Sequence, residues 1–374
     1  MKKISLITFV LLLLCSCSDK TKTLTITNPC NFDRNDEVLV LNPVALNLDP
    51  AGALVDAAGN MLPAQIDEAT GEYLVQVSIP ANQSVNFCWR PLNDGETRPE
   101  PVAKVSARFV PERKDDFAWE NDRAAYRMYG PALAAENPSN GVDLWLKQTG
   151  ELVVDTFYYN EHQKGQSYHI NWGKGLDCYK VGHTLGCGGV APYYGDSLYV
   201  QGHYDSYEVL SAGPLRTVFR LGYDTIHVAD RTYRQSLTIT VCAGALLNRA
   251  DVVLEGEPLE GLQLAAGIFL HDSIDTYRVD LLDGTLAYAE NAFNELDRSP
   301  VGRNYTAVVM PGADAEAQTL GSYCLLSGYK PGDTLTYYFG GGWNGWLYPQ
   351  DADWFRAVSE TKSAIDHPLL IEVK

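Results

Sequence analysis

Short segments in which apolar and polar residues alternate recur along almost the whole chain, with turn formers between them. Residues 216–220 and 237–241 show this alternation most clearly. Because successive side chains of a β-strand point to opposite faces, a period of two residues predicts strands with one buried face. Short strands separated by regular turns predict all-β sandwiches. Helices are few, and the best candidate is 352–365, with Asp351 as its expected cap.

The sequence predicts two all-β domains joined by a linker. Residues 24–91 hold short strand patterns and form the expected small β-sandwich. Residues 92–101 are rich in proline and polar turn formers, as linkers are. Residues 102–374 continue with longer strand patterns, which predict a large sandwich. A chain of 374 residues is long enough for two domains.

Residues 1–16 have the pattern of a bacterial lipoprotein signal peptide. Lys2 and Lys3 precede an apolar run that is too short to span a bilayer. The run ends in Leu-Cys-Ser-Cys, which resembles a lipobox with Cys17 as the lipidated residue and 17–23 as a tether. We therefore expect an outer-membrane lipoprotein that faces the periplasm or the cell surface, held by lipid alone. A plain cleaved signal peptide is the alternative.

The charge of the chain excludes one class of partner. The formal net charge is −18, which argues against nucleic-acid binding. The sequence contains no phosphate-binding loop, dinucleotide fingerprint, G-x-S-x-G or H-E-x-x-H motif.

Six cysteines follow Cys17, and the sequence leaves open whether they pair or stay free and buried.

Residues 112–133 place many charges among aromatic side chains. Saccharide sites have this composition, because sugar rings stack on aromatic faces while charged groups bind hydroxyls. As one strand, the segment would carry an arginine-rich face and an acidic face; a helix would instead align Glu120, Arg123 and Arg127. A structural stretch of ion pairs is the alternative to a binding site. The arginine-rich face comprises Trp119, Asn121, Arg123, Arg127 and Tyr129, and the acidic face holds Glu120 and Asp122.

The segment 167–207 is rich in glycine and lacks a strand pattern, which predicts a binding rim. Within it, His169 and His183 are candidate acid–base groups, although a loop histidine is more often a plain hydrogen-bonding residue. Cys178, His183 and Cys187 do not have a standard zinc spacing, so no metal site is predicted. No cofactor is predicted, and a calcium ion stays open.

Two strand ends and one glycine-rich segment each allow a functional and a structural interpretation. One strand pattern ends at His271 and another at Glu290, where side chains can reach a cleft from a rigid base. Polar hairpin residues are the alternative. The triple glycine 340–342 before Trp343 either lets backbone approach a ligand or forms a tight turn over the core.

Several stretches together resemble one family: 24–29 with 32–37, 112–123 with 129–131, 173–183, and 341–343. The chain resembles, over nearly its whole mature length, an uncharacterised family of secreted or lipid-anchored proteins of Gram-negative glycan degraders, many encoded near pectin-degrading enzymes. That family looks like the galactose-mutarotase-type β-supersandwich, which epimerases, polysaccharide lyases and glycosidase-associated domains share. The resemblance implies a sugar ligand, but it implies no single reaction and brings no assigned catalytic residue.

The first functional hypothesis is an enzyme that acts on uronate-containing, pectin-type oligosaccharides by acid–base chemistry, as an epimerase, lyase or hydrolase. Arg123 and Arg127 would hold the carboxylate, and His183 or His169 would act as base. Glu120 or Asp122 would be its partner. The alternatives are a non-catalytic glycan-binding lipoprotein and a structural partner in an outer-membrane uptake complex. Other predicted substrate-binding residues are Asn121, Trp119, Tyr129, Lys180, Trp172 and Trp343.

Overall fold

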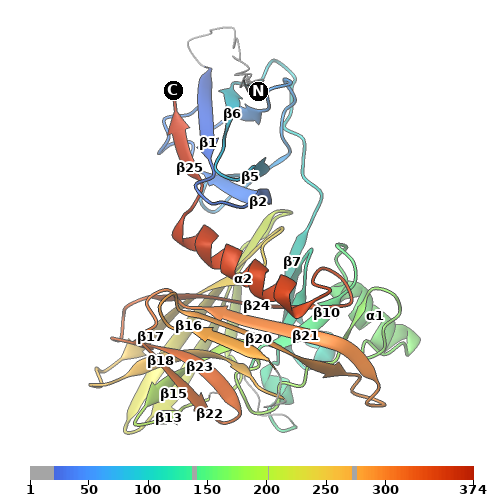
Figure 1. Ribbon diagram of the computed structural model, residues 1–374, viewed down its shortest axis with the longest axis vertical. Coiled ribbons are helices and arrows are strands. Elements are labelled where there is room, and N and C mark those ends of the chain that lie inside the picture. The colour runs from blue at the N-terminus through green and yellow to red at the C-terminus, as the bar shows by residue number, and fades with distance from the viewer. Residues whose placement is uncertain (1–20, 137–140, 201, 272–275) are drawn as a thin grey trace, which may run out of the picture.

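The computed structural model describes residues 21–136, 141–200, 202–271 and 276–374. Within these ranges the chain forms 25 β-strands and two α-helices, which confirms the predicted all-β class with few helices. Figure 1 shows a small lobe above a large lobe, with helix α2 between them. None of the helices in the described ranges is long and apolar enough to cross a membrane. The predicted leader, 1–16, and the lipidation site Cys17 lie outside the described residues.

The small lobe is a sandwich of two antiparallel sheets, ordered β25-β1-β6-β3 and β2-β5-β4. Leu24, Ile26, Tyr73 and Trp89 fill its core. The last strand of the chain, β25, pairs with β1, which is a long-range contact that sequence periodicity does not reveal. The strands are Lys22–Thr27 (β1), Arg34–Leu41 (β2), Ala53–Val55 (β3), Ala64–Ile66 (β4), Tyr73–Ile79 (β5), Ser84–Arg90 (β6) and Leu370–Val373 (β25).

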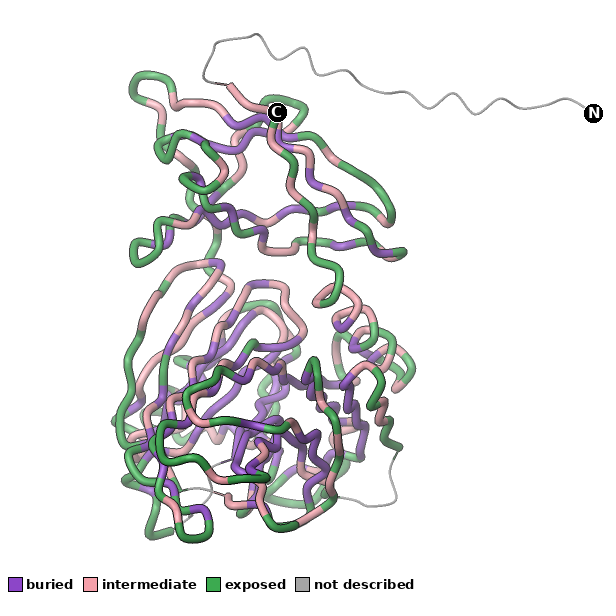
Figure 2. Tube along the Cα trace, turned by 90° about the vertical axis from the view of Figure 1, so that its left-hand side faces the viewer, coloured by how far each residue is buried: buried purple, intermediate pink, exposed green. Residues whose placement is uncertain are grey.

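The large lobe packs an eight-stranded sheet, ordered β14-β15-β16-β17-β24-β21-β20-β19, against two five-stranded sheets. Figure 2 shows the buried residues gathered inside this lobe. The five-stranded sheets are ordered β13-β12-β18-β23-β22 and β11-β10-β9-β8-β7. The strands are Val105–Val110 (β7), Asp116–Asn121 (β8), Ala125–Met128 (β9), Asp143–Lys147 (β10), Gly175–Asp177 (β11), Cys187–Tyr194 (β12), Ser197–Leu198 (β13), Ser206–Ser211 (β14), Arg216–Val228 (β15), Arg231–Cys242 (β16), Asn248–Gly256 (β17), Gln263–Phe269 (β18), Tyr277–Asp280 (β19), Thr285–Phe293 (β20), Pro300–Val309 (β21), Ala315–Thr319 (β22), Ser322–Gly328 (β23) and Leu335–Trp343 (β24).

The charged segment 112–133 is a hairpin of β8 and β9, so its interpretation as one continuous strand is wrong. The turn forms because the Asn121 side chain accepts hydrogen bonds from the backbone N–H groups of Arg123 and Ala124. Ala118 lies opposite Arg127, and Trp119 lies opposite Tyr126. Opposite residues of a strand pair share a face, and neighbouring residues of a strand alternate. Trp119 and Arg127 therefore lie on different faces of the sheet.

Two helices pack on sheet faces of the large lobe. The helix α2, Asp351–Asp366, confirms the predicted helix, and it buries Trp354 and Val358. Its N-cap is Gln350, in a capping box with Asp353, so the expected capping role of Asp351 is wrong. The helix α1, Val154–Lys164, was not predicted. Its apolar residues are too few for a clear helical stripe, and tertiary contacts with Trp145 hold it in place.

The segment 167–207 is only partly the irregular rim that its sequence predicts. It contains β11, β12 and β13. The strand β12 pairs with the buried strand β18 from Cys187 to Tyr193, so this part of the segment is core. Its sequence, CGGVAPYY, is fully buried for six residues and therefore lacks the alternation that marks a half-exposed strand. Residues 178–182 stay irregular, and they form one wall of a cavity.

Candidate functional site

The large lobe contains a cavity of about 750 Å³. Its walls come from the loop after β11, the residue that follows β9, and the adjacent strands β20 and β21 with the turn between them. The strands β20 and β21 give one wall a rigid base, which helps to keep a site in a fixed geometry. The polar side chains in its lining are Tyr129, Cys178, Tyr179, Lys180, His271, Glu290, Asn291, Glu295, Arg298 and Asn304.

His271 and Glu290 meet at this cavity from two different sheets. Nδ1 of His271 is 2.6 Å from a Glu290 carboxylate oxygen, and Nε2 is 2.6 Å from the carbonyl oxygen of Lys180. A carbonyl can only accept, so Nε2 carries a proton. Burial favours the neutral ring, but the hydrogen bond and charge of Glu290 outweigh it and raise the pKa of His271. Both ring nitrogens are therefore occupied, and the ring holds the Lys180 loop against β20.

Asn304 extends this polar cluster along β21. Its side-chain nitrogen donates to Glu290 at 2.9 Å. Its side-chain oxygen is buried and has no hydrogen-bond partner among the described residues. A buried acceptor without a partner is costly. Asn304 therefore belongs to the buried polar wall of the cavity.

Glu295 is the second carboxyl group of the cavity, and its side chain is 34% exposed. Burial raises the pKa of Glu295, and the charge of His169 opposes this shift. Nδ1 of His169 lies 3.7 Å from a Glu295 oxygen and donates to the backbone oxygen of Asp177 at 2.9 Å. That bond fixes the ring with Nδ1 protonated. His169 does not line the cavity itself, but it contacts a residue that does.

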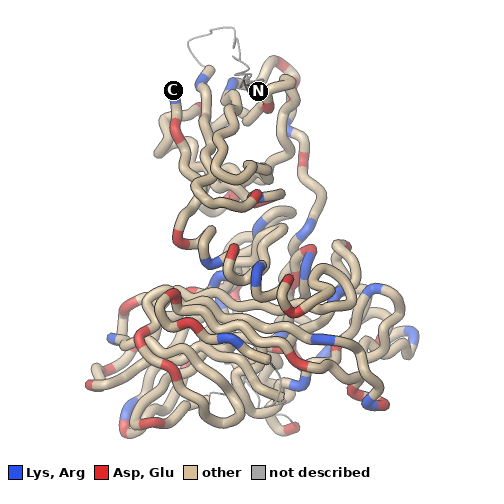
Figure 3. The backbone as a smooth tube through the Cα atoms, viewed as in Figure 1, with Lys and Arg blue, Asp and Glu red and all other residues tan. Residues whose placement is uncertain are grey.

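Two cations line the same cavity. Lys180 is exposed, and Arg298 packs its guanidinium on the ring of Phe293 at 5.3 Å. Neither forms an ion pair with a described residue closer than 4.0 Å. Figure 3 shows acidic and basic positions interspersed over both lobes in this view, so no broad basic face is visible there. An anionic ligand would depend on these local cations.

The structure contradicts the predicted role of Arg127 in an open groove. Its side chain is 2% exposed and pairs with Asp143 at 2.5 Å and with Asp177 at 2.9 Å. The guanidinium also packs on the rings of Tyr129 and Trp145 at 4.9 and 5.0 Å. Tyr129 does line the cavity, and its ring lies against the Arg127 guanidinium. Burial raises the pKa of Tyr129. Arg127 is thus a buried structural cation, as the alternative interpretation held.

The acidic face predicted beside it is structural as well. Glu120 is buried, pairs with Lys147 at 2.9 Å, and accepts the backbone N–H groups of Val153 and Val154 at the start of α1. It cannot contact a sugar there. Asp122 accepts the N–H of Gly244 at 2.7 Å and so ties the hairpin turn to another turn. A catalytic role for Glu120 is not compatible with these contacts, whereas Asp122 is partly exposed outside the cavity and its role stays a prediction.

Other predicted residues separate into buried and exposed groups. Trp119 is fully buried in the core, and Asn121 is buried with its amide bonded to the oxygens of Cys242 and Ala245. Trp343 is also buried, and its indole N–H bonds to Val301. These three cannot bind a saccharide in this structure. The exposed residues Trp172 and His183 do not line the cavity, and their roles stay predictions.

The triple glycine 340–342 serves packing. A side-chain carbon on Gly341 would lie 2.4 Å from Leu144, and the N–H of Gly341 bonds to the Tyr126 hydroxyl. This supports the interpretation that the glycines lie over the core. The described residues contain no cluster of three or more His, Cys, Asp or Glu side chains able to hold a metal ion, and the six cysteines after Cys17 are free.

Sequence comparison establishes the family. The family model described as a domain of unknown function, DUF4861, matches residues 26–371, and the chain belongs to this family. An uncharacterized protein of Formosa agariphila is 28% identical over 300 residues, which cover 75% of this chain and 73% of that protein. The predicted membership of an uncharacterised family is thus confirmed.

Solved structures with the same fold are larger. A protein in glycosyl hydrolase family 38 from Enterococcus faecalis superimposes with a TM-score of 0.56 and 8% identity, covering 96% of this chain and 48% of that chain. An alpha-mannosidase from Enterococcus faecalis gives 0.50 and 8%, covering 96% and 46%. This chain therefore spans about half the length of either protein. At such low identity the likeness defines the fold, a β-rich one, and leaves the reaction to the residues of this chain.

Sequence reasoning missed four polar residues of the cavity: Asn291, Glu295, Arg298 and Asn304. Asn304 is the first residue of the buried run of β21, and a polar residue in such a run was a usable signal. Glu295 and Arg298 lie in a turn of mixed polar sequence that resembles any surface turn. His271 and Glu290 were noted as strand-end residues, but only the packing of two different sheets brings the end of β18 close to β20.

Proposed function

We propose that this protein is a carbohydrate-active enzyme that acts on uronate-containing, pectin-type oligosaccharides by acid–base chemistry in the cavity around Glu295. The observation that carries the proposal is the combination of Glu295, whose pKa is raised, with Lys180 and Arg298 in one cavity of about 750 Å³. A raised pKa moves a carboxyl group toward the range in which general acids work. The two cations supply charges that a uronate carboxylate needs.

Each remaining residue has a proposed task. Asn304 would hold the buried carboxylate of Glu290 in place behind the cavity wall. Tyr129 offers an aromatic face. His271 would position Glu290 and the Lys180 loop, since both of its ring nitrogens are engaged. Proteins described as a glycosyl hydrolase and an alpha-mannosidase share the fold, which supports a carbohydrate substrate without specifying the reaction.

Incubation of the purified protein with galacturonate di- and trisaccharides, followed by proton NMR, tests this function. NMR detects hydrolysis, elimination and epimerisation alike, and neutral galactose oligosaccharides serve as the matched substrates. Glu295→Gln, which keeps the side-chain shape, should abolish turnover, whereas Glu68→Gln on the exposed surface of the small lobe should not change it. Full turnover by the Glu295→Gln variant would contradict the assignment. Binding without any product would favour the non-catalytic glycan-binding alternative.

We also propose that Cys17 carries a lipid and anchors the protein at the outer membrane. The lipobox-like sequence before it supports this proposal. Labelling of a bacterial host with an alkyne fatty acid should tag the wild type and leave Cys17→Ala untagged. Equal labelling of both proteins would exclude this residue as the anchor.

A further inference from the structure

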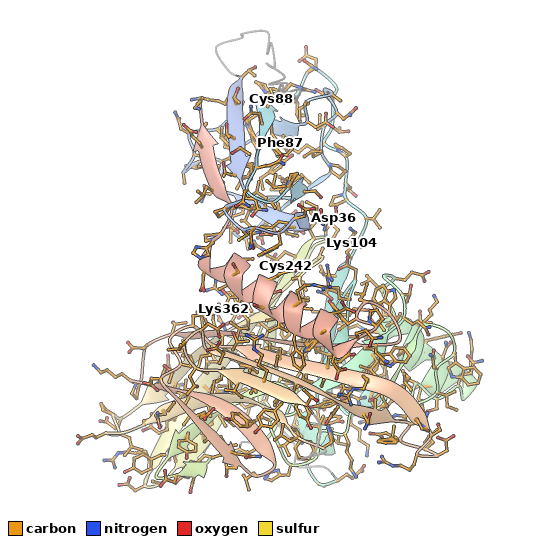
Figure 4. All side chains as sticks on the ribbon, viewed as in Figure 1. Asp36, Phe87, Cys88, Lys104, Cys242 and Lys362 are labelled. Atoms are coloured by element: carbon orange, nitrogen blue, oxygen red, sulfur yellow. The ribbon has the colours of Figure 1, made fainter. Side chains whose placement is uncertain are left out.

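A second cavity, of about 550 Å³, lies where the two lobes meet. The small lobe contributes the start of β2, and the large lobe contributes the hairpin turn at Arg123, the turn after β16 and one side of α2. Figure 4 shows Cys242, one of the lining residues, at this junction beneath Asp36. The chemistry of this cavity is separate from that of the cavity at Glu295, because the two share no lining residue.

Arg123 presents unused hydrogen-bond donors to this cavity. Its Nε donates to the backbone oxygen of Gly244 at 2.6 Å, and Nη1 donates to the Tyr348 hydroxyl at 3.2 Å. A guanidinium has five N–H donors, so the other three have no partner among the described residues. Arg123 also forms no ion pair with a described residue, although it is only partly exposed.

Tyr348 supplies a second, independent signal. The residue is 7% exposed, and its hydroxyl accepts a hydrogen bond from Arg123. The proton of that hydroxyl has no acceptor among the described residues. The ring is fixed by edge contacts with Trp354 at 5.1 Å and Tyr305 at 6.4 Å. The hydroxyl is therefore a buried donor with a fixed position in the cavity lining.

Other cations of the cavity are already neutralised. Arg34 pairs with Glu37, and Arg249 pairs with Asp251 at 2.9 Å. Arg123 and Tyr348 remain as neighbouring donors that lack an acceptor. A guanidinium fork and a hydroxyl match the two oxygens of a carboxylate, and such charge-assisted hydrogen bonds are among the stronger ones in proteins.

We propose that Arg123 and Tyr348 form a second ligand site, which binds a carboxylate group between the lobes. The carboxylate belongs to a small organic acid or to a uronate residue of a saccharide. The site depends on its own residues, so it stands whether or not the cavity at Glu295 is catalytic.

Hydrogen–deuterium exchange with acetate, galacturonate and galactose as separate probes tests the site. Carboxylates should slow exchange in the turn at residues 243–247 and in residues 345–349, whereas neutral galactose should not. Protection by galacturonate alone identifies a uronate, and protection by acetate as well identifies any carboxylate. If neither anion protects these segments, the proposal is wrong.

Variants assign the effect to these side chains. Arg123→Gln should raise the dissociation constant of the protecting anion by about 10-fold or more, and Tyr348→Phe by about 5-fold. Tyr348→Phe keeps the packed ring, so it remains informative if Arg123→Gln does not fold. Lys180→Gln, in the other cavity, should leave the protection of 243–247 unchanged. Undiminished protection in the Tyr348→Phe variant would overturn the site.

Discussion

Replacement of Arg127 separates a structural role from a binding role. Its guanidinium pairs with Asp143 and Asp177, and Asp116 lies 3.7 Å away. Removing one partner of a buried ion pair leaves an uncompensated charge and costs about 3–5 kcal/mol. Since about 1 kcal/mol shifts the melting temperature of a large domain by about 2 °C, Arg127→Met should lower it by about 6–10 °C.

Differential scanning calorimetry of the wild type and three variants measures this effect. The matched control is Arg220→Met, because Arg220 also lies on a strand but pairs with Glu208 at 3.4 Å on the exposed surface. Exposed pairs contribute about 0–1 kcal/mol. Adding Asp143→Asn and Asp177→Asn to Arg127→Met removes the stranded charges and should recover part of the loss. The reasoning is refuted if Arg127→Met melts like the wild type but loses saccharide turnover, which would show contact with the ligand.

Two further perturbations test the buried charges. Burial raises the pKa of Asp116 to about 6. Between about pH 4 and pH 6 the folded protein therefore keeps a proton that the unfolded chain releases, and the free energy of unfolding falls as the pH rises through this range. Urea unfolding at several pH values should show that Asp116→Asn lacks this decline. At the lobe junction, burial would raise the pKa of Asp67, but Ser211 and Arg216 outweigh it and hold it at about 2. This stability is present above about pH 4 and is lost as the pH falls through about 2. Arg216→Met should lower the free energy of unfolding by about 3–5 kcal/mol and should split the calorimetric transition into one for each lobe. A single unshifted transition would contradict the role of the Arg216–Asp67 ion pair in joining the lobes.

The sequence determined the class of the fold because strand periodicity is a local property. Alternating residues in 216–220 and 237–241 lie in β15 and β16, and Trp354 marks the buried side of α2. Where a strand is buried on both faces, as β12 is, alternation disappears and the prediction failed. The helix α1 was missed because contacts with β8 and β10 hold it, and its own sequence is a weak signal.

The candidate site was decided by tertiary structure. Arg123 and Arg127 are four residues apart in the sequence, yet the hairpin turn between β8 and β9 sends one toward the lobe junction and the other into the core. His271 and Glu290 became a pair because β18 and β20 belong to different sheets that meet at the cavity. The sequence by itself specified which residues alternate, turn and carry charge. Only the packing of sheets, which joins residues far apart in the chain, specified which charges are buried and neutralised and which still face open space.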